Sequence, residues 1–275
     1  MKSKMKEIQN QEEMLQLQYY ARYLYNSAES LYIFKVVNLI LNCILAVTNA
    51  PALIIIIATI TVLGINWLIN CCINRAAEAR EIFDCELFGF EQPKNTIDIK
   101  RKAYNLCCRK NKNYKVQKAN NGKDNPPGVR DWYTCIKGNS RKEDILNCQI
   151  ENTKWDEKIM KIYLFILLGI IMLSILVYLV INYHNTIEEM LKAGAIIIEI
   201  ICEFINTVFN FKKYNDNLAL RKNKIDEIDS NNINDKDLLR LQSFIYERRK
   251  IKIIPFNLIH SVISKKMHET SEMIN

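Results

Sequence analysis

Polar side chains repeat along one face of an otherwise apolar stretch near residue 200. The repeat consists of Glu199, Glu203, Asn206 and Asn210. Its spacing of four, three and four residues places all of them on one side of an α-helix. Carboxylates inside a membrane are costly and usually face a bundle interior or water, so a pore lining and a structural role are equally favoured for the two glutamates. Asn38 and Asn42 repeat the spacing elsewhere, where hydrogen bonding between helices is the favoured interpretation.

A second group of residues combines aromatic and charged side chains in the charged parts of the chain. The candidates for direct ligand contact are Arg80, Arg130, Trp132, Tyr133, Trp155, Arg248 and Arg249, and the candidates that orient them are Asp84, Gln149 and Asn152. Aromatic rings and guanidinium groups stack on nucleobases, and basic side chains bind phosphate. The competing interpretation is that these residues form the core of a helical domain, and for any single one of them it is the favoured interpretation.

Motifs of the common enzyme classes are absent from the sequence. There is no phosphate-binding P-loop, no zinc-protease HExxH, no GxSxG and no GxGxxG. The chain has only three histidines and seven glycines, and its nine cysteines form no CxxC pair. Zinc sites usually show such pairs. We therefore expect no catalytic residue, no metal site and no cofactor, and the chain is not expected to be an enzyme.

The elements that must position these residues begin with residues 36–74, which contain no charged side chain. A transmembrane helix needs about 20 apolar residues, so this block is long enough for two. Pro51 lacks a backbone donor and disfavours helix at Ala50, which predicts a turn there. The block therefore predicts a transmembrane hairpin with spans at about 33–49 and 52–73.

A second predicted hairpin occupies residues 162–211. Residues 162–182 are uncharged and fit one span, and residues 193–211 fit another. The two turns between spans contain one basic residue, Lys192, and all other basic residues lie outside them. By the positive-inside rule, both termini and the central region are expected in the cytoplasm.

The sequence thus predicts an all-α membrane protein with four transmembrane helices in two hairpins. A mostly helical cytoplasmic domain is built from three separated segments. These are an N-terminal amphipathic helix at 1–35, a central sensor region at 75–161 and a C-terminal helical region at 212–275. A capping box at Ser140 and Glu143 predicts a helix start, and residues 110–130 are predicted to be a polar loop.

The charge balance points to an anionic partner of the domain outside the membrane. Apolar residues make up 49% of the 275-residue chain and charged residues 25%, with a net charge of +8. The positive excess is spread through the parts outside the apolar blocks. Such an excess suits the cytoplasmic face of a lipid bilayer or an anionic ligand, and a nucleic-acid polymer is not expected.

Four segments of the chain resemble one known family. They are AREIFDCELFGF at 79–90, RDWYT at 130–134, CQIENTKWDEKI at 148–159 and RLQSFIYERRKIKIIPFNLIH at 240–260. They are similar to elements of the SMODS-associated four-transmembrane effector family, including its D-W-Y element and its C-Q-x-x-N-x-x-W-D signature. One departure is Phe256-Asn257-Leu258, where that family often has an acidic and aromatic run.

The resemblance implies a membrane effector of bacterial anti-phage signalling (CBASS). In that class, infection activates a CD-NTase, a nucleotidyltransferase that is a functional partner without a stable complex. Its cyclic di- or trinucleotide binds the effector, which assembles as a homo-oligomer and permeabilises the inner membrane, causing abortive infection.

One alternative from a different class stays open. It is a constitutive ion channel or transporter subunit centred on Glu199 and Glu203, which predicts conductance without any ligand.

Overall fold

The computed structural model of the chain describes residues 4–47, 51–122, 127–137, 140–181, 194–229 and 232–253. Within these ranges the protein is mostly helical and contains no strand; an isolated bridge joins Asn121 and Arg130. The helices are α1 (Met5–Ile8), α2 (Glu12–Val47), α3 (Ala52–Phe88), α4 (Thr96–Arg109), α5 (Asn111–Ala119), α6 (Arg141–Ile181), α8 (Gly194–Glu227) and α9 (Asp235–Lys250).

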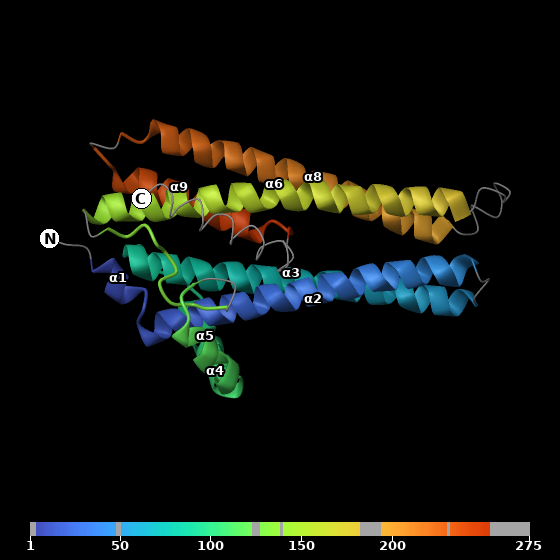
Figure 1. The fold of residues 1–275 in the computed structure, drawn as a ribbon, viewed down its shortest axis with the longest axis horizontal. Coiled ribbons are helices and arrows are strands. Elements are labelled where there is room, and N and C mark those ends of the chain that lie inside the picture. Colours follow the sequence, from blue (N-terminus) through green and yellow to red (C-terminus); the bar gives the residue numbers. More distant parts are fainter. Residues whose placement is uncertain are drawn as a thin grey trace.

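The four long helices form two hairpins that lie along the length of the molecule (Figure 1). Helices α2 and α3 pack against each other, and α6 packs against α8. At the end of the bundle where α1 lies, α9 packs against α3, α6 and α8, while α4 and α5 project from α2. Thus α9 contacts both hairpins and connects them at one end of the bundle.

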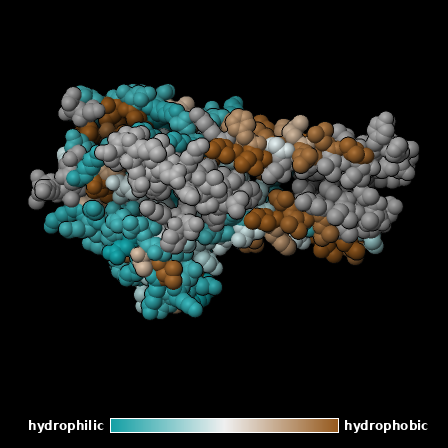
Figure 2. All heavy atoms as spheres, viewed as in Figure 1, coloured by the Kyte–Doolittle hydropathy of each residue, from teal (hydrophilic) through white to brown (hydrophobic). Residues whose placement is uncertain are grey.

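The opposite end of the bundle is apolar on its outer surface (Figure 2). Its exposed side chains include Leu53, Ile57, Ile60, Leu63, Trp67, Phe165, Leu173 and Val180. Among the described residues, one helical segment, Ile56–Phe88, is long and apolar enough to cross a membrane. Most of its apolar stretch is not buried inside the protein, unlike the core helix of a soluble domain. These observations agree with the expected helical membrane class.

The polar end of the bundle has a hydrophobic core of its own. It is assembled from α2, α3, α6 and α9, with Leu17, Phe83, Phe88, Ile145 and Leu241 among its fully buried members. These residues are distant in sequence, so the core brings the predicted N-terminal, central and C-terminal segments together. Burying several large apolar side chains is the dominant favourable term for such a domain.

Helix α3 continues beyond the uncharged block without a break, as its alanine- and glutamate-rich continuation favours. It ends at Gly89, whose φ of 68° is readily adopted only by glycine. At the start of α6 the predicted capping box is present. The Ser140 amide donates to Glu143 at 3.1 Å, and the Glu143 amide donates to the Ser140 hydroxyl at 3.3 Å.

The predicted polar loop is wrong over part of its length, because α5 (Asn111–Ala119) is a helix. Its Tyr114 hydroxyl donates to Glu12 at 2.9 Å, and its ring packs edge-on against Tyr19. Contacts to a helix about 100 residues earlier thus hold a segment whose local composition favours a loop. The predicted turns at 48–50 and 183–192 lie outside the described residues.

Candidate functional site

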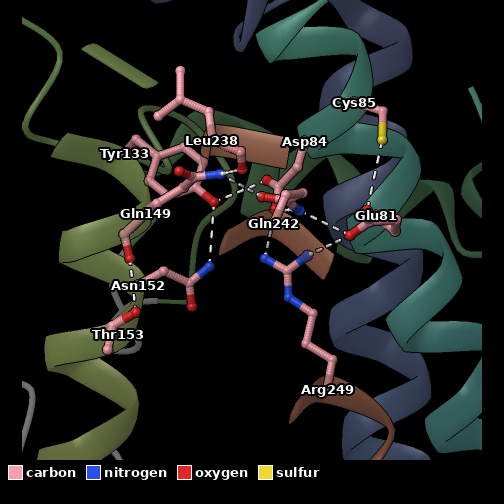
Figure 3. A network of polar contacts seen from close by, with 10 residues as sticks. All are labelled: Glu81, Asp84, Cys85, Tyr133, Gln149, Asn152, Thr153, Leu238, Gln242 and Arg249. Carbon is pink, nitrogen blue, oxygen red and sulfur yellow. Dashed lines mark hydrogen bonds and ion pairs between the residues drawn. The ribbon is translucent and has the colours of Figure 1, made fainter. Parts of the chain in front are cut away.

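A buried network around Asp84 joins α3, α6, α9 and the segment that contains Tyr133 (Figure 3). Asp84 accepts hydrogen bonds from the Tyr133 hydroxyl at 2.8 Å, from Gln242 at 3.0 Å and from Arg249 Nη2 at 2.7 Å. Gln149 donates to Gln242 at 3.2 Å, and Asn152 donates to the Tyr133 hydroxyl at 3.3 Å. Two candidate ligand residues, Tyr133 and Arg249, and the three candidate orienting residues therefore bind one another or Gln242.

Glu81 lies one helical turn before Asp84 and belongs to the same network. It accepts a hydrogen bond from Gln242 at 2.8 Å, and Arg249 Nη1 lies 3.6 Å from its Oε2. Burial raises the pKa of Glu81 to about 7, despite the opposing attraction of Arg249. Burial acts to lower the pKa of Arg249, but Asp84 together with Tyr133, Glu81 and Tyr25 outweighs it, and the pKa lies above its usual value. The network is close to charge balance.

A second network surrounds Asp156 on α6. Its Oδ2 accepts from Arg221 at 2.7 Å and from Arg248 Nε at 3.0 Å, and Arg248 Nη2 lies 2.8 Å from Oδ1. The Arg248 guanidinium also stacks over the Tyr214 ring at 5.0 Å. Trp155 precedes Asp156 and is half-buried. This network connects α6, α8 and α9, and it carries two guanidinium groups for one carboxylate.

The remaining aromatic and basic candidates include Arg80, which lies one helical turn before Asp84 on α3. The Arg80 guanidinium stacks over Trp132 at 4.5 Å and over Tyr25 at 5.1 Å. Arg22 lies 6.0 Å from the centre of the Trp132 ring. Arg130 is exposed. Trp132 therefore already has cationic partners from α2 and α3, which ties the loop to the first hairpin.

A cavity of about 690 Å³ lies between the two hairpins, beside the C-terminal end of α9. Its polar lining comes from α3, α8 and the end of α9, with Asn66, Asn70, Glu203, Asn206, Asn210 and Lys252 among its residues. Three members of the repeat around residue 200, Glu203, Asn206 and Asn210, thus line one cavity. This is the size of a typical small-molecule site.

At this cavity Glu203 forms an ion pair across the two hairpins. Lys35 on α2 pairs with its Oε2, and the Tyr32 hydroxyl donates to its Oε1 at 3.2 Å. Nearby, Lys252 donates to the Asn66 side chain at 3.0 Å. Because Glu203 is fully occupied by α2 groups, its carboxylate connects the hairpins in this arrangement.

The other polar candidates of the apolar blocks have simpler surroundings. Asn38 donates to the Ala58 carbonyl at 3.1 Å, which is a hydrogen bond between α2 and α3 of the kind expected. The side chains of Asn42 and Glu199 lie outside the described part of the structure.

Several of these partners were not identified by the sequence reasoning, namely Tyr32, Lys35, Gln242, Arg221 and Lys252. Two of them could have been found from the sequence. Lys35 borders the uncharged block, and Gln242 lies in the segment RLQSFIYERRK that resembles the family. The others could not be found from spacing, because their partners come from distant parts of the chain.

The charged and polar groups of these networks can bind a ligand or hold helices together. Among the described residues, no group of three or more His, Cys, Asp or Glu could hold a metal ion. The titratable groups are engaged in ion pairs and hydrogen bonds between helices. These ion pairs join helices that are distant in the sequence.

The fold and these sites define a helical membrane protein whose polar end is tied together by buried charge networks. A family model for the SMODS-associating 4TM effector domain matches residues 3–274. The chain therefore belongs to this effector family, as the four sequence segments indicated. No curated protein and no solved structure gives a significant match to the chain.

Proposed function

We propose that the chain is a cyclic-oligonucleotide-activated effector of a bacterial CBASS anti-phage system. A cyclic di- or trinucleotide made by a partner CD-NTase binds the polar end of the bundle. The effector then oligomerises and permeabilises the inner membrane, which ends in abortive infection. Membership of an effector family associated with such systems supports this proposal.

The observation that carries the proposal is the continuity of α3 (Ala52–Phe88). One unbroken helix contains both the apolar stretch and the Glu81–Asp84 turn that binds Arg249 of α9. A displacement of α9 therefore acts on the same rigid element that enters the membrane. A conformational change caused by ligand binding is therefore transmitted along α3 to the membrane-spanning segment without a flexible linker.

In this proposal four helices cross the membrane, with both termini and the central region in the cytoplasm. Helices α2, α3, α6 and α8 each contain more than 30 residues. At about 1.5 Å per residue each is near 50 Å long, whereas the hydrocarbon core is about 30 Å thick. Each helix therefore has length for one span and for a segment in the polar end.

Activation requires the ligand to bind the open, assembled state more tightly than the resting state. In the resting state the ion pairs of Asp84, Asp156 and Glu203 hold α9 and both hairpins together. An anionic ligand at the cavity competes with Glu203 for the cations around it, including Lys35. Such competition gives the differential affinity that a shift of state needs.

Dye release from liposomes tests the proposal. The purified protein is reconstituted into vesicles, and a panel of cyclic di- and trinucleotides is added, with the matched linear nucleotides as controls. We expect one cyclic compound to bind and to release the dye, and the linear control to do neither. Absence of both binding and release for the whole panel contradicts the proposal.

The constitutive-channel alternative gives the opposite pattern in the same vesicles. It predicts conductance without nucleotide that Glu199→Gln abolishes. The effector predicts sealed vesicles without nucleotide.

A further inference from the structure

The cavity between the hairpins lies at the junction of the two ends of the molecule. One wall comes from residues at the apolar end, including Asn66 and Leu167, and another from the end of α9, including Lys250 and Lys252. Arg248 and Arg249, which hold the two buried networks, immediately precede this α9 wall. A molecule bound in the cavity therefore contacts the element that both networks position.

The charges around this cavity do not cancel. Its lining contains Lys213, Lys250 and Lys252 but only two carboxylates, Glu203 and Glu247. Glu247 pairs with Lys250 at 2.8 Å, and Glu203 pairs with Lys35 of α2. Lys213 and Lys252 form no ion pair with any described carboxylate. Lys213 is exposed to solvent, and the carboxylate that acts on Lys252, Glu203, is already ion-paired with Lys35. The lining therefore carries more positive than negative charge among the described residues.

Lys252 is the more informative of the two, because it is largely withdrawn from solvent. Its Nζ donates to the Asn66 amide oxygen at 3.0 Å. Burial lowers the pKa of Lys252 and the neighbouring Lys35 ammonium lowers it further, and the attraction of Glu203 does not offset them. A buried cation normally has an anionic partner, since its desolvation otherwise costs free energy. An anion seated in the cavity supplies that partner.

We propose that this cavity is a phosphate-binding site, in which Lys213 and Lys252 contact the phosphate groups of an anionic ligand and the surrounding asparagines donate further hydrogen bonds. Where the ligand is a cyclic oligonucleotide, the proposal rests on the proposed function and places its ligand site. The phosphate of an anionic lipid has the same chemistry. A phosphate beside Lys35 and Lys252 also competes with Glu203 for Lys35, which loosens the connection between the hairpins.

The test compares two double variants of the full chain that change the net charge equally. Lys213→Gln with Lys252→Gln removes the proposed contacts. The control, Lys154→Gln with Lys236→Gln, removes two exposed lysines that are not part of the cavity lining. Binding of the cyclic di- and trinucleotide panel is measured by calorimetry in nanodiscs of phosphatidylcholine. We expect affinity to fall about tenfold or more per lost lysine contact in the first variant only.

A second arm distinguishes a lipid source of the phosphate. Unfolding midpoints are compared in phosphatidylglycerol and phosphatidylcholine nanodiscs. If a lipid occupies the cavity, phosphatidylglycerol raises the midpoint of the wild type and of the control, but not that of the cavity variant. The midpoint in phosphatidylcholine shows whether each variant is folded.

The outcomes separate this proposal from the proposed function. If the wild type binds a cyclic oligonucleotide and the cavity variant binds it equally well, the cavity is not the nucleotide site, while the effector function stands. If no cyclic oligonucleotide binds the wild type, the proposed effector function is contradicted. The phosphatidylglycerol experiment then decides whether the cavity binds phosphate. If the cavity variant then also keeps its response to phosphatidylglycerol, the phosphate site is overturned.

Discussion

The Asp84 network and the cavity between the hairpins both place charged groups between helices, but they differ in charge balance. Around Asp84, Arg249 is paired with Asp84 and lies beside Glu81, whose pKa is raised to about 7. At the cavity, Lys213 and Lys252 form no ion pair with a described carboxylate. The first arrangement supplies its cation with a counter-charge without any ligand, whereas the second has room and charge for one.

This difference in charge balance suggests a structural role for the Asp84 network and a ligand-responsive role for the cavity. Removing one partner from a complete buried pair strands the other charge, so such pairs are fixed parts of a fold. An incomplete cluster gains free energy when an anion arrives. We therefore assign the Asp84 network to holding α9 on α3, and the cavity to sensing.

The largest expected effect on stability follows from removing Asp84 from its network. Asp84→Ala leaves Arg249 buried beside a partly protonated Glu81, and the free energy of unfolding should fall by about 3–5 kcal/mol. Denaturant unfolding in detergent measures this change. Asp98→Ala, at an exposed position whose partners lie on its own helix, is the control. If both variants are equally stable, Asp84 does not hold the network.

The pH dependence of stability also tests the Asp84 network, through Glu81. The pKa of Glu81 rises from an ordinary value of 4.5 to about 7 on folding. The folded state therefore binds more protons, and stability is lost as pH rises from about 4.5 to about 7. The loss is at most about 3 kcal/mol, since each unit of pKa is worth about 1.4 kcal/mol. The free energy of unfolding of the wild type relative to Glu81→Gln should fall across this range; a constant difference contradicts the assignment.

An intermediate effect is expected where α3 connects the two regions. Asn74 and Arg75 are exposed on this helix, so replacing both by glycine softens it without removing packing. Relative to the double alanine control, helix stability falls by about 1–2 kcal/mol. Nucleotide affinity should persist while nucleotide-triggered dye release falls. Equal release from both variants argues against a rigid connection.

The smallest effect is expected at the incomplete cluster in the absence of ligand. Lys252→Gln removes a cation that has no described carboxylate partner, so the unfolding midpoint should stay unchanged or rise. Lys35→Gln strands Glu203 and should lower it. A thermal scan of the two variants in phosphatidylcholine nanodiscs makes the comparison. A clear drop for Lys252→Gln means that this lysine has a stabilising partner in the resting protein.

The sequence predicted much of the architecture, because uncharged blocks and capping signals are local properties. The uncharged block at 36–74 and the capping box of Ser140 are both recognisable from neighbouring residues alone. Helix α5 was missed because Tyr114 is held by Glu12 of a distant segment.

The candidate site was less predictable for the same reason. Helical spacing placed Glu203 on a polar face, but nothing local indicates that Lys35 is its partner. Likewise, the sequence brought Asp84 and Arg249 into one candidate list without indicating that they bind each other. Pairings across more than 160 residues depend on the packing of the hairpins.

The position of α9 in the chain has a consequence for biosynthesis. Translation produces Asp84 and Asp156 long before it produces Arg248 and Arg249, which are their partners in the folded protein. Both hairpins are therefore synthesised before the helix that connects them. A nascent chain that stops short of residue 248 lacks these two sets of ion pairs, so the contacts of α9 with the hairpins form only when synthesis has passed α9.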